Sequence, residues 1–222
     1  MAVSARDTLV IAVDGPAAAG KGTLARRLAS HLGLAYLDTG RIYRAVARLV
    51  LEAGAAPDDE RAAVAAAKSL RPHDLDRLDL RDEATGEAAS VVAGIPAVRA
   101  ALLAFQRRFA EAPPGGAAGA VLDGRDIGTV VCPSAPVKLF VTASAEERAR
   151  RRHKELREAG VEGIYSRVLA DLIARDERDS GRSVAPLRPA ADAVVLDTTS
   201  LSADDAFEEA LRHVEVRLRH RS

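Results

Sequence analysis

The sequence has a single cysteine, Cys132, among 222 residues. One thiol excludes an internal disulfide, and a chain without disulfides fits a reducing compartment. Long apolar runs are also missing, since the run near the N-terminus, Leu9–Val13, is far too short to cross a membrane. We therefore expect a cytoplasmic protein with no membrane partner, and we interpret Cys132 as a small residue at the end of a strand.

Net charge is absent as well, because 32 basic residues balance 32 acidic ones, while 48% of the residues are apolar. This composition argues against disorder and against a polyanion-binding surface, so nucleic acid is not an expected partner. Lysine is scarce, with four among the basic residues and arginine supplying the other 28. Arginine forks suit phosphates, although high-GC coding also enriches arginine. The length fits one α/β domain, and we expect a monomer.

The sequence is organised around the stretch from Thr8 to Thr23, TLVIAVDGPAAAGKGT. An apolar run typical of a buried parallel strand breaks at a glycine loop, which leads into an amphipathic helix. Backbone N–H groups of such a loop and the positive end of the helix bind phosphate. Glycine-rich turns are common in an alanine-rich chain, but the strand, spacing, lysine and helix together favour nucleotide binding. The residues predicted to bind the phosphates of a nucleotide are Gly15, Pro16, Ala17, Ala18, Ala19, Gly20, Lys21, Gly22 and Thr23.

One position departs from the general phosphate-loop pattern: Gly22 stands where a Ser or Thr hydroxyl would ligate Mg²⁺, and the hydroxyl comes at Thr23. We therefore predict that Mg²⁺ is held through phosphates and water, near Thr23 and Asp14, and not by direct protein ligands. Asp14 and Asp123 both end predicted strands, and each can be interpreted as a loop cap or as a neighbour of Mg²⁺-bound water. The five histidines show no metal-ligand spacing.

Strands alternate with helices along the chain, which predicts an α/β fold with a doubly wound, parallel, five-stranded sheet. The predicted strands are residues 9–13, 34–37, 119–123, 136–141 and 193–197. Within a single domain, residues 1–222, the core is expected to comprise residues 1–38, 113–147 and 190–222. Residues 39–112 and 148–189 are surplus to this core. Surplus helices beside a phosphate site would form an acceptor pocket, here residues 39–112, and a closing lid, residues 148–189.

Three groups of arginines are candidates to converge on phosphate: Arg41 with Arg44, Arg125, and the series Arg175, Arg178 and Arg182. The series is spaced to lie on one face of a helix that continues that far, with Asp179 pairing with Arg175. Taken alone, this pattern favours a solvated salt-bridge face. If the protein transfers a phosphoryl group to a phosphate acceptor, a phosphate-binding role for these arginines is favoured instead, because such a transfer needs several fixed cations and no general base.

Five segments, in this order, resemble the bacterial cytidylate kinases: IAVDGPAAAGKGT, LDTGRIYR, IPAVRAALLAFQRRF, LDGRDIGTVVCPSAPVKLFV and RDERDSGRSVAPLRPAADAVVLDTT. The similarity covers nearly the whole chain, and DGRDIGTVV and RDERDSGRSVAPL are far more specific than the glycine loop. Between Ser69 and Ser90 the chain departs from longer family members, whose β-rich insert is here much shorter and more charged. The resemblance implies a P-loop kinase that transfers the ATP γ-phosphoryl group to CMP, and commonly to dCMP, with Mg²⁺, in pyrimidine nucleotide metabolism.

The resemblance also implies roles for single residues. The cationic catalytic set would be Lys21, Arg125, Arg175 and Arg182. The acceptor phosphate would be held by Thr39, Arg44 and Arg125. Cytosine would be recognised by Ser90, Arg99 and Asp126, although Ser90 taken alone is more typical of a helix cap. Arg175 and Asp179 would hold the sugar, Arg182 would bridge toward the phosphates, and Arg151 and Arg152 match lid arginines.

Other functions stay open at this point. A kinase of the same fold could act on UMP, on another nucleoside monophosphate, or on a non-nucleotide alcohol; an alcohol would require a general base, making Asp14 or Asp38 essential. A nucleotide-dependent switch or motor would turn over without an acceptor and expose an apolar patch, and the neutral charge and lack of extra domains argue against it. A non-catalytic relative is the weakest alternative, because the lysine and every matched arginine are present.

Overall fold

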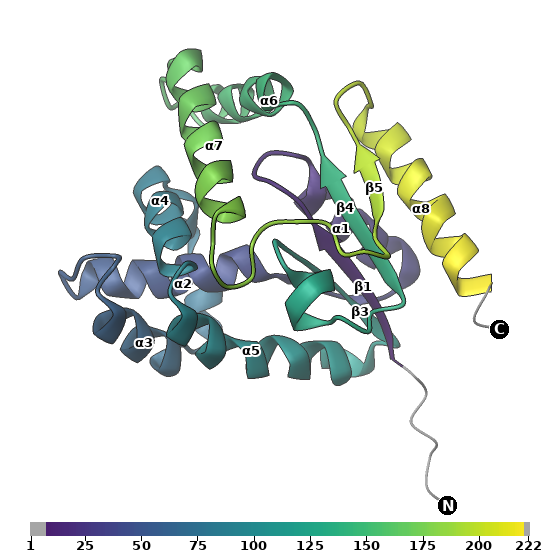
Figure 1. Ribbon diagram of the computed structural model, residues 1–222, viewed down its shortest axis with the longest axis horizontal. Coiled ribbons are helices and arrows are strands. Elements are labelled where there is room, and N and C mark those ends of the chain that lie inside the picture. Colours follow the sequence, from purple (N-terminus) through teal and green to yellow (C-terminus); the bar gives the residue numbers. More distant parts are fainter. Residues whose placement is uncertain (1–7, 220–222) are drawn as a thin grey trace, which may run out of the picture. The chain divides into compact units, whose positions relative to one another are not determined.

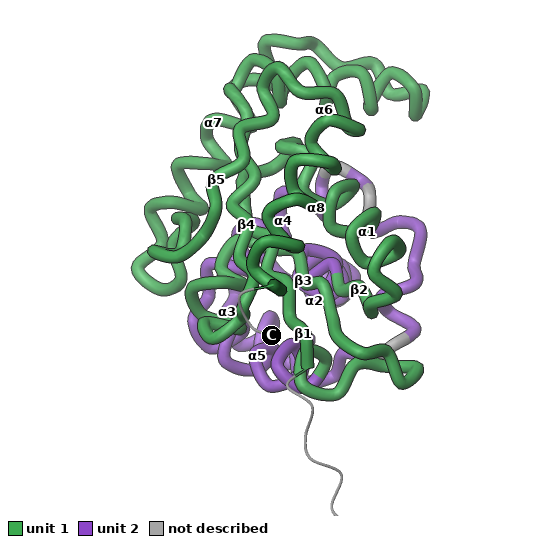
Figure 2. Tube along the Cα trace, turned by 90° about the vertical axis from the view of Figure 1, so that its right-hand side faces the viewer, with its two compact units in different colours: residues 1–37, 109–222 green, residues 38–108 purple. Residues whose placement is uncertain are grey.

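The structure, a computed structural model, describes residues 8–219 and divides into two compact units (Figures 1 and 2). The first unit comprises the chain up to residue 37 and from residue 109 onward, and the second comprises residues 38–108. Figure 2 colours the first unit green and the second purple.

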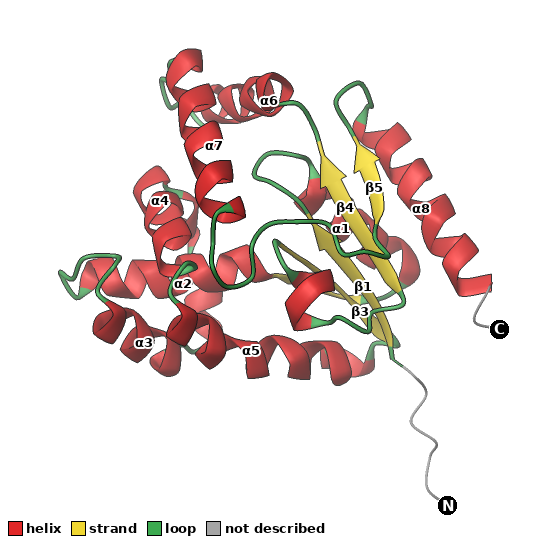
Figure 3. Cartoon of the chain, viewed as in Figure 1, coloured by secondary structure: helices red, strands yellow, loops and turns green. Residues whose placement is uncertain are grey.

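The first unit contains a five-stranded sheet with the strand order β2-β3-β1-β4-β5 (Figure 3). The pairs β1–β3, β1–β4 and β4–β5 are parallel. The strands are β1 (Leu9–Asp14), β2 (Ala35–Asp38), β3 (Gly119–Gly124), β4 (Val137–Thr142) and β5 (Val194–Asp197). The predicted α/β fold with a five-stranded parallel sheet is confirmed, and each strand lies within one residue of its predicted ends.

Both faces of this sheet are used, because successive side chains of a strand point to opposite sides. Ile11 and Val13 of β1 join the main hydrophobic cluster, which also contains side chains of α1 (Lys21–Leu32) and α8 (Ala203–Arg219). Asp14 points to the opposite face, where it contacts a π-helical turn, η4 (Ile127–Val131). The carboxyl ends of β1 and β3 therefore lie between a helical layer and η4.

The helix ends follow local signals. α1 stops at Gly33, whose φ of 65° is left-handed and whose N–H bonds Ala29 O. The next helix of the unit, α6 (Ala145–Glu158), begins after Ser144, whose hydroxyl accepts the Glu147 N–H at 3.2 Å. α8 begins in the same way after Ser202, which accepts the Asp205 N–H at 3.1 Å.

α6 packs against α7 (Tyr165–Ser180) through a small cluster of buried side chains, Ala149, Val168 and Leu172. Ala17 and Ala18 of the glycine loop pack against the same cluster. The helices predicted to form a lid are therefore joined to the loop predicted to bind ATP by apolar contacts within one unit. A short turn, η3 (Pro114–Gly116), precedes β3.

The second unit is helical, and no strand occurs in its described residues beyond Asp38, the last residue of β2. Its elements are α2 (Thr39–Glu52), α3 (Glu60–Ser69), η1 (Pro72–Asp76), η2 (Leu78–Arg81), α4 (Glu83–Val92) and α5 (Pro96–Glu111), whose last residues belong to the first unit. α2 and α4 pack together, and Ile42, Val46 and Val50 of α2 are fully or almost fully buried. The sequence did not predict α4, because its short span is flanked by charged residues.

Within α5, Phe105 and Phe109 are only half-buried, whereas Gln106 is 2% exposed and donates from Nε2 to Leu102 O at 3.3 Å. Two local predictions are wrong. Cys132 is buried, but it follows η4 and ends no strand. Ser90 lies inside α4 and therefore caps no helix.

Among residues 8–219, no single helix combines the length and apolar composition needed to cross a membrane. One sharply bent pair, Ala84–Val92 with Pro96–Gly116, meets those criteria only when its two parts are taken together.

Candidate active site

The loop that follows β1 has the backbone of a phosphate cradle. Gly15 has a φ of 151°, and a Cβ there would lie 2.0 Å from Val141 O, so no side chain fits. Ala18 and Gly20 also have positive φ values, 58° and 86°, an unusual conformation for alanine. Gly20 is the N-cap of α1, and Lys21 is its first residue. The loop therefore joins left-handed turns to a helix N-terminus, an arrangement that turns backbone N–H groups toward an anion.

Gly22 lies close to a buried carboxylate. A Cβ at Gly22 would lie 3.2 Å from Asp123 Oδ2, and the same oxygen accepts the Tyr36 hydroxyl at 2.7 Å. Asp123 is 3% exposed. Among the described residues, no group of three or more His, Cys, Asp or Glu side chains is arranged to hold a metal ion.

Asp14 joins the end of β1 to η4. Its Oδ1 accepts the Ile127 N–H and its Oδ2 accepts the Gly128 N–H, both at 2.7 Å. The side chain is 4% exposed, and burial raises its pKa to about 7 against the opposing effect of these two hydrogen bonds. Because both oxygens bind backbone, the hydrogen bonds support the loop-cap interpretation of Asp14.

Replacing Asp14 with asparagine should destabilise the protein, and this cost should shrink as the pH rises from about 5 to about 8. The amide places an N–H₂ group opposite one backbone N–H, which costs ~1–3 kcal/mol near pH 5. In the wild type, a pKa raised from 3.8 to about 7 means that the folded state holds a proton that the unfolded state has lost, so stability falls with rising pH in this window. The asparagine of the variant does not titrate, so the variant does not lose stability in this way. Urea unfolding of both proteins across that range measures the difference, and a cost that stays constant or grows with pH would contradict the raised pKa.

Asp179 lies at the centre of a cluster of arginines from separate parts of the first unit. Arg125, which follows β3, donates from Nε to Asp179 Oδ2 at 2.9 Å, and Arg182 bonds Asp179 Oδ1. The Asp179 side chain is 2% exposed. Burial alone would raise the pKa of this carboxyl, but the charges of Arg125, Arg182 and Arg175 hold the pKa below its ordinary value. The ionised carboxylate therefore fixes two guanidinium groups at one place.

This geometry corrects the predicted arginine series. α7 ends at Ser180, so Arg182 lies beyond the helix and cannot share a helical face with Arg175 and Arg178. Arg178 is exposed, as a solvated face requires, but the pairs of Asp179 are buried, which excludes the solvated salt-bridge interpretation for them. The chain reverses after α7, where the Leu187 N–H bonds Asp179 O at 2.8 Å.

Arg148 is an arginine that the sequence did not single out. Its side chain is 6% exposed and forms an ion pair with Asp176 of α7 at 2.6 Å. It also donates to Ala143 O at 2.9 Å and to Ala17 O of the phosphate loop at 3.3 Å. Four arginines stand within five residues of α6, and helical spacing alone does not show which of them points inward. Arg148 thus ties both predicted lid helices to the loop.

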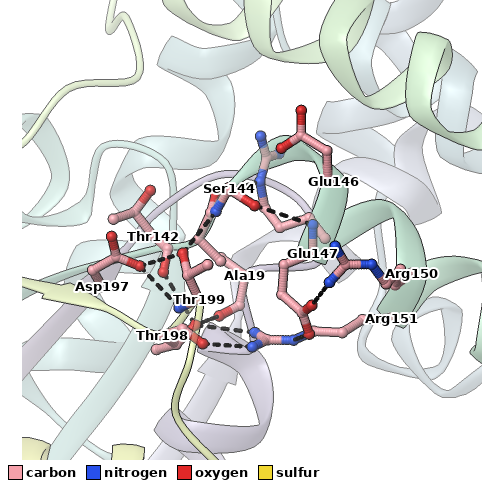
Figure 4. A network of polar contacts seen from close by, with 12 residues as sticks. Ala19, Thr142, Ser144, Glu146, Glu147, Arg150, Arg151, Asp197, Thr198 and Thr199 are labelled. Atoms are coloured by element: carbon pink, nitrogen blue, oxygen red, sulfur yellow. Dashed lines mark hydrogen bonds and ion pairs between the residues drawn. The ribbon is translucent and has the colours of Figure 1, made fainter.

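Arg151 and Arg152, the two arginines that were matched to the lid, differ in their contacts. Arg151 donates to Thr198, the residue after β5, through Nη1 to Oγ1 at 3.0 Å and through Nη2 to the carbonyl oxygen at 2.5 Å (Figure 4). Arg152 pairs with Glu155 at 3.3 Å on the surface of α6. Only Arg151 of this pair contacts the region around the phosphate loop, since its Nη1 lies 3.7 Å from where a Gly20 Cβ would be.

The predicted acceptor residues divide between the units. In the first unit, the N-cap of η4 is Asp126, which is 4% exposed. In the second unit, Thr39 begins α2 and is 3% exposed, and Arg44 lies one turn later, with its Nη1 3.6 Å from a Cβ position at Gly40.

Two more predicted acceptor residues in the second unit are almost fully buried. Ser90 of α4 is 4% exposed and Arg99 of α5 is 8% exposed. Arg99 donates to Ala93 O at 3.2 Å, and its guanidinium lies 5.6 Å from the centre of the Tyr43 ring. Tyr43 is itself 8% exposed, in agreement with a packing role that supports Arg99.

Comparisons with known proteins show which family the chain belongs to. A family model described as cytidylate kinase matches residues 11–216. Cytidylate kinase of Paramagnetospirillum magneticum is 65% identical over 91% of this chain and 95% of its own, and that of Granulibacter bethesdensis is 63% identical over 91% and 94%. A crystal structure of an uncharacterized protein from Eubacterium ventriosum aligns with a TM-score of 0.53 at 14% identity, covering 94% of this chain and 99% of that one, which shows the fold alone. Since the family model spans most of the sequence and the relatives share well over half of their residues with it, the chain belongs to the cytidylate kinase family.

Proposed function

We propose that the protein transfers the γ-phosphoryl group of ATP to CMP, and also to dCMP, giving ADP and CDP or dCDP. The family supports the reaction class, and the relatives carry the name cytidylate kinase. The observation that carries the proposal is the buried Arg125–Asp179–Arg182 cluster. β1 and β3 pair with Asp14 opposite Gly124, so the phosphate loop and Arg125 leave the sheet at the same edge.

The proposed mechanism relies on charge and positioning. Backbone N–H groups of residues 15–23, except Pro16, which has none, bind the ATP phosphates, and Lys21 stabilises the group in transfer. Arg125 and Arg182, oriented by Asp179, offset the charge of the two polyanions as they approach, and Arg175 adds a third cation. The acceptor phosphate is already ionised at neutral pH, so an in-line attack needs no general base.

The residues present fit Mg²⁺, which would neutralise charge on the phosphate oxygens. Asp123 has a carboxylate close to Gly22, the position at which phosphate loops ordinarily carry a hydroxyl ligand. We therefore propose that Asp123 and the Thr23 hydroxyl hold Mg²⁺, chiefly through water. Asp14 is a poorer candidate because backbone N–H groups bind both of its oxygens.

For the acceptor, we propose that Thr39 and Arg44 bind its phosphate together with Arg125. The exocyclic amine of cytosine needs an acceptor, which Asp126 supplies, and O2 and N3 need donors such as Arg99 and Ser90. Arg175 and Asp179 would hold the sugar. In this proposal residues 39–112 bind the nucleoside monophosphate and residues 148–189 close over the donor.

We further propose that the protein works as a monomer in cytoplasmic pyrimidine nucleotide metabolism, on CMP, dCMP and ATP, without nucleic-acid or membrane partners. The neutral charge and the single cysteine support this assignment.

The deciding experiment measures ADP release from ATP and Mg²⁺ with CMP, dCMP, UMP, AMP, GMP or no acceptor. We expect release with CMP and dCMP at least about tenfold above the other acceptors, because the proposed cytosine contacts demand both a donor and an acceptor pattern. Chromatography of the products should show CDP or dCDP in equal amount to ADP. Comparable ADP release without an acceptor would instead indicate a hydrolase or a switch, and a preference for UMP would overturn the base contacts.

A further inference from the structure

Thr198, the first residue after β5, joins three parts of the first unit through one buried side chain. It is 4% exposed, and its Oγ1 lies 3.1 Å from Ala19 O of the phosphate loop and 3.1 Å from Thr142 O at the end of β4. The same oxygen accepts Nη1 of Arg151 from α6 at 3.0 Å (Figure 4). No role was assigned to this residue by the sequence motifs.

The chemistry of a hydroxyl sets the direction of this contact chain. Thr198 Oγ1 has one hydrogen to donate, and Thr142 O already accepts the Thr198 backbone N–H at 2.8 Å. The hydroxyl can donate to either carbonyl oxygen, while a lone pair of its oxygen accepts from the charged guanidinium. Thr198 thus links Arg151 to the phosphate loop and to the end of β4.

Arg151 is held in a fixed orientation by this arrangement. Its Nε donates to Glu147 Oε1 at 3.1 Å, and its two terminal nitrogens donate to the hydroxyl and the carbonyl of Thr198. These contacts use three of its five N–H groups, and the other two have no hydrogen-bond partner within the part of the chain that the structure describes. Since Nη1 lies 3.7 Å from a Cβ position at Gly20, the guanidinium is beside the loop that would carry the donor phosphates.

We propose that Thr198 is a positioning residue for the ATP side of the site: it holds Arg151 against the phosphate loop so that the remaining N–H groups meet the donor phosphates. The proposal rests on the proposed use of ATP. Only serine or threonine can offer a side-chain hydroxyl and its own carbonyl oxygen to the two terminal nitrogens of Arg151, whose guanidinium group is rigid and planar. Thr198 couples the loop after β5 and α6 to donor binding.

The test compares Thr198→Val, which keeps the shape and removes the hydroxyl, with Thr198→Ser, which restores it. We expect Thr198→Val to weaken ATP binding, measured as Kd by calorimetry without CMP and as KM in the kinase assay, by about tenfold. KM for CMP should stay within about twofold, and Thr198→Ser should return the ATP values to within about threefold of the wild type. A general loss of fold would shift both substrates and the melting temperature together.

Thr199→Val is the matched control, because it makes the same change at the next residue. The Thr199 hydroxyl accepts the Ser144 N–H at 2.9 Å and bonds Asp197, but it contacts neither Arg151 nor the phosphate loop in any interaction among the described residues. We expect its ATP Kd to match the wild type.

A double-substitution cycle with Arg151→Ala separates positioning from simple loop support. If Thr198 acts through Arg151, Thr198→Val should have no further effect on ATP Kd once Arg151 is gone. Additive effects, or a wild-type Kd for Thr198→Val, would overturn the inference. The calorimetry also separates the two proposals: ATP binding without CMP phosphorylation would refute the proposed function and leave the Thr198 comparison valid, whereas no ATP binding at all would refute both.

Discussion

Replacing Lys21 with methionine should lower kcat for CMP phosphorylation by about 10³-fold while the protein stays folded. Lys21 is the first residue of α1, directly after the loop whose positive φ values shape the phosphate cradle. Removing one charged group that stabilises a transferring phosphoryl group costs on the order of 10²–10³-fold or more. The loss should appear in kcat more than in KM for CMP, because the lysine is proposed to contact the group in transfer and not the base.

The thermal stability of Lys21→Met should not fall with its kcat. A positive charge in the first turn of a helix opposes the helix dipole, so methionine at this position should leave the melting temperature unchanged or slightly higher. Steady-state kinetics and thermal unfolding of the same preparation measure the two effects. Lys154→Met is the matched control, since Lys154 is 77% exposed on α6 and should show wild-type kinetics. A Lys21→Met variant with wild-type kcat would remove the lysine from the transfer step.

The sequence predicted those parts of the molecule that follow from local patterning. Apolar runs predicted every strand within one residue at each end, because buried parallel strands are almost continuously apolar. Gly33 ends α1 and Asp38 caps α2, and a left-handed glycine and a side-chain cap are both short-range signals. The glycine spacing before Lys21 likewise predicted the loop geometry.

What the sequence did not predict depends on residues far apart in the chain. Gly181 is a local signal that α7 ends before Arg182, but nothing nearby indicates that Arg182 bonds a carboxylate shared with Arg125, 57 positions earlier in the numbering. Thr198 and Arg148 are ordinary polar residues until the fold surrounds them with carbonyl groups and an acidic partner. Burial of charged groups is a property of tertiary packing, and the periodicity of the sequence does not predict it.

Replacing Arg125 with alanine should lower kcat/KM for CMP by about 10²–10³-fold and should also destabilise the protein. Arg125 is proposed to bind the acceptor phosphate, and it is also one of two cations bonded to the buried carboxylate of Asp179. Arg125→Lys keeps the positive charge but lacks the planar guanidinium group, so we expect a smaller loss of kcat/KM, of about tenfold. Arg150→Ala, at a side chain 65% exposed on α6, is the control and should retain wild-type kinetics.

The pH dependence of unfolding gives Arg125 a second, independent readout. In the wild type the pKa of Asp179 is held below its ordinary value, so its ionised form contributes stability above that ordinary value, and this contribution is lost as the pH falls through the lowered pKa. Without Arg125, burial opposes only Arg182 and Arg175, and the pKa of Asp179 rises. The acid-unfolding midpoint of Arg125→Ala, followed by circular dichroism, should therefore lie at a higher pH than that of the wild type, while Arg150→Ala should not move it. An unchanged midpoint together with a large kinetic loss would mean that Arg125 acts on the acceptor alone and that Arg182 suffices to keep Asp179 ionised.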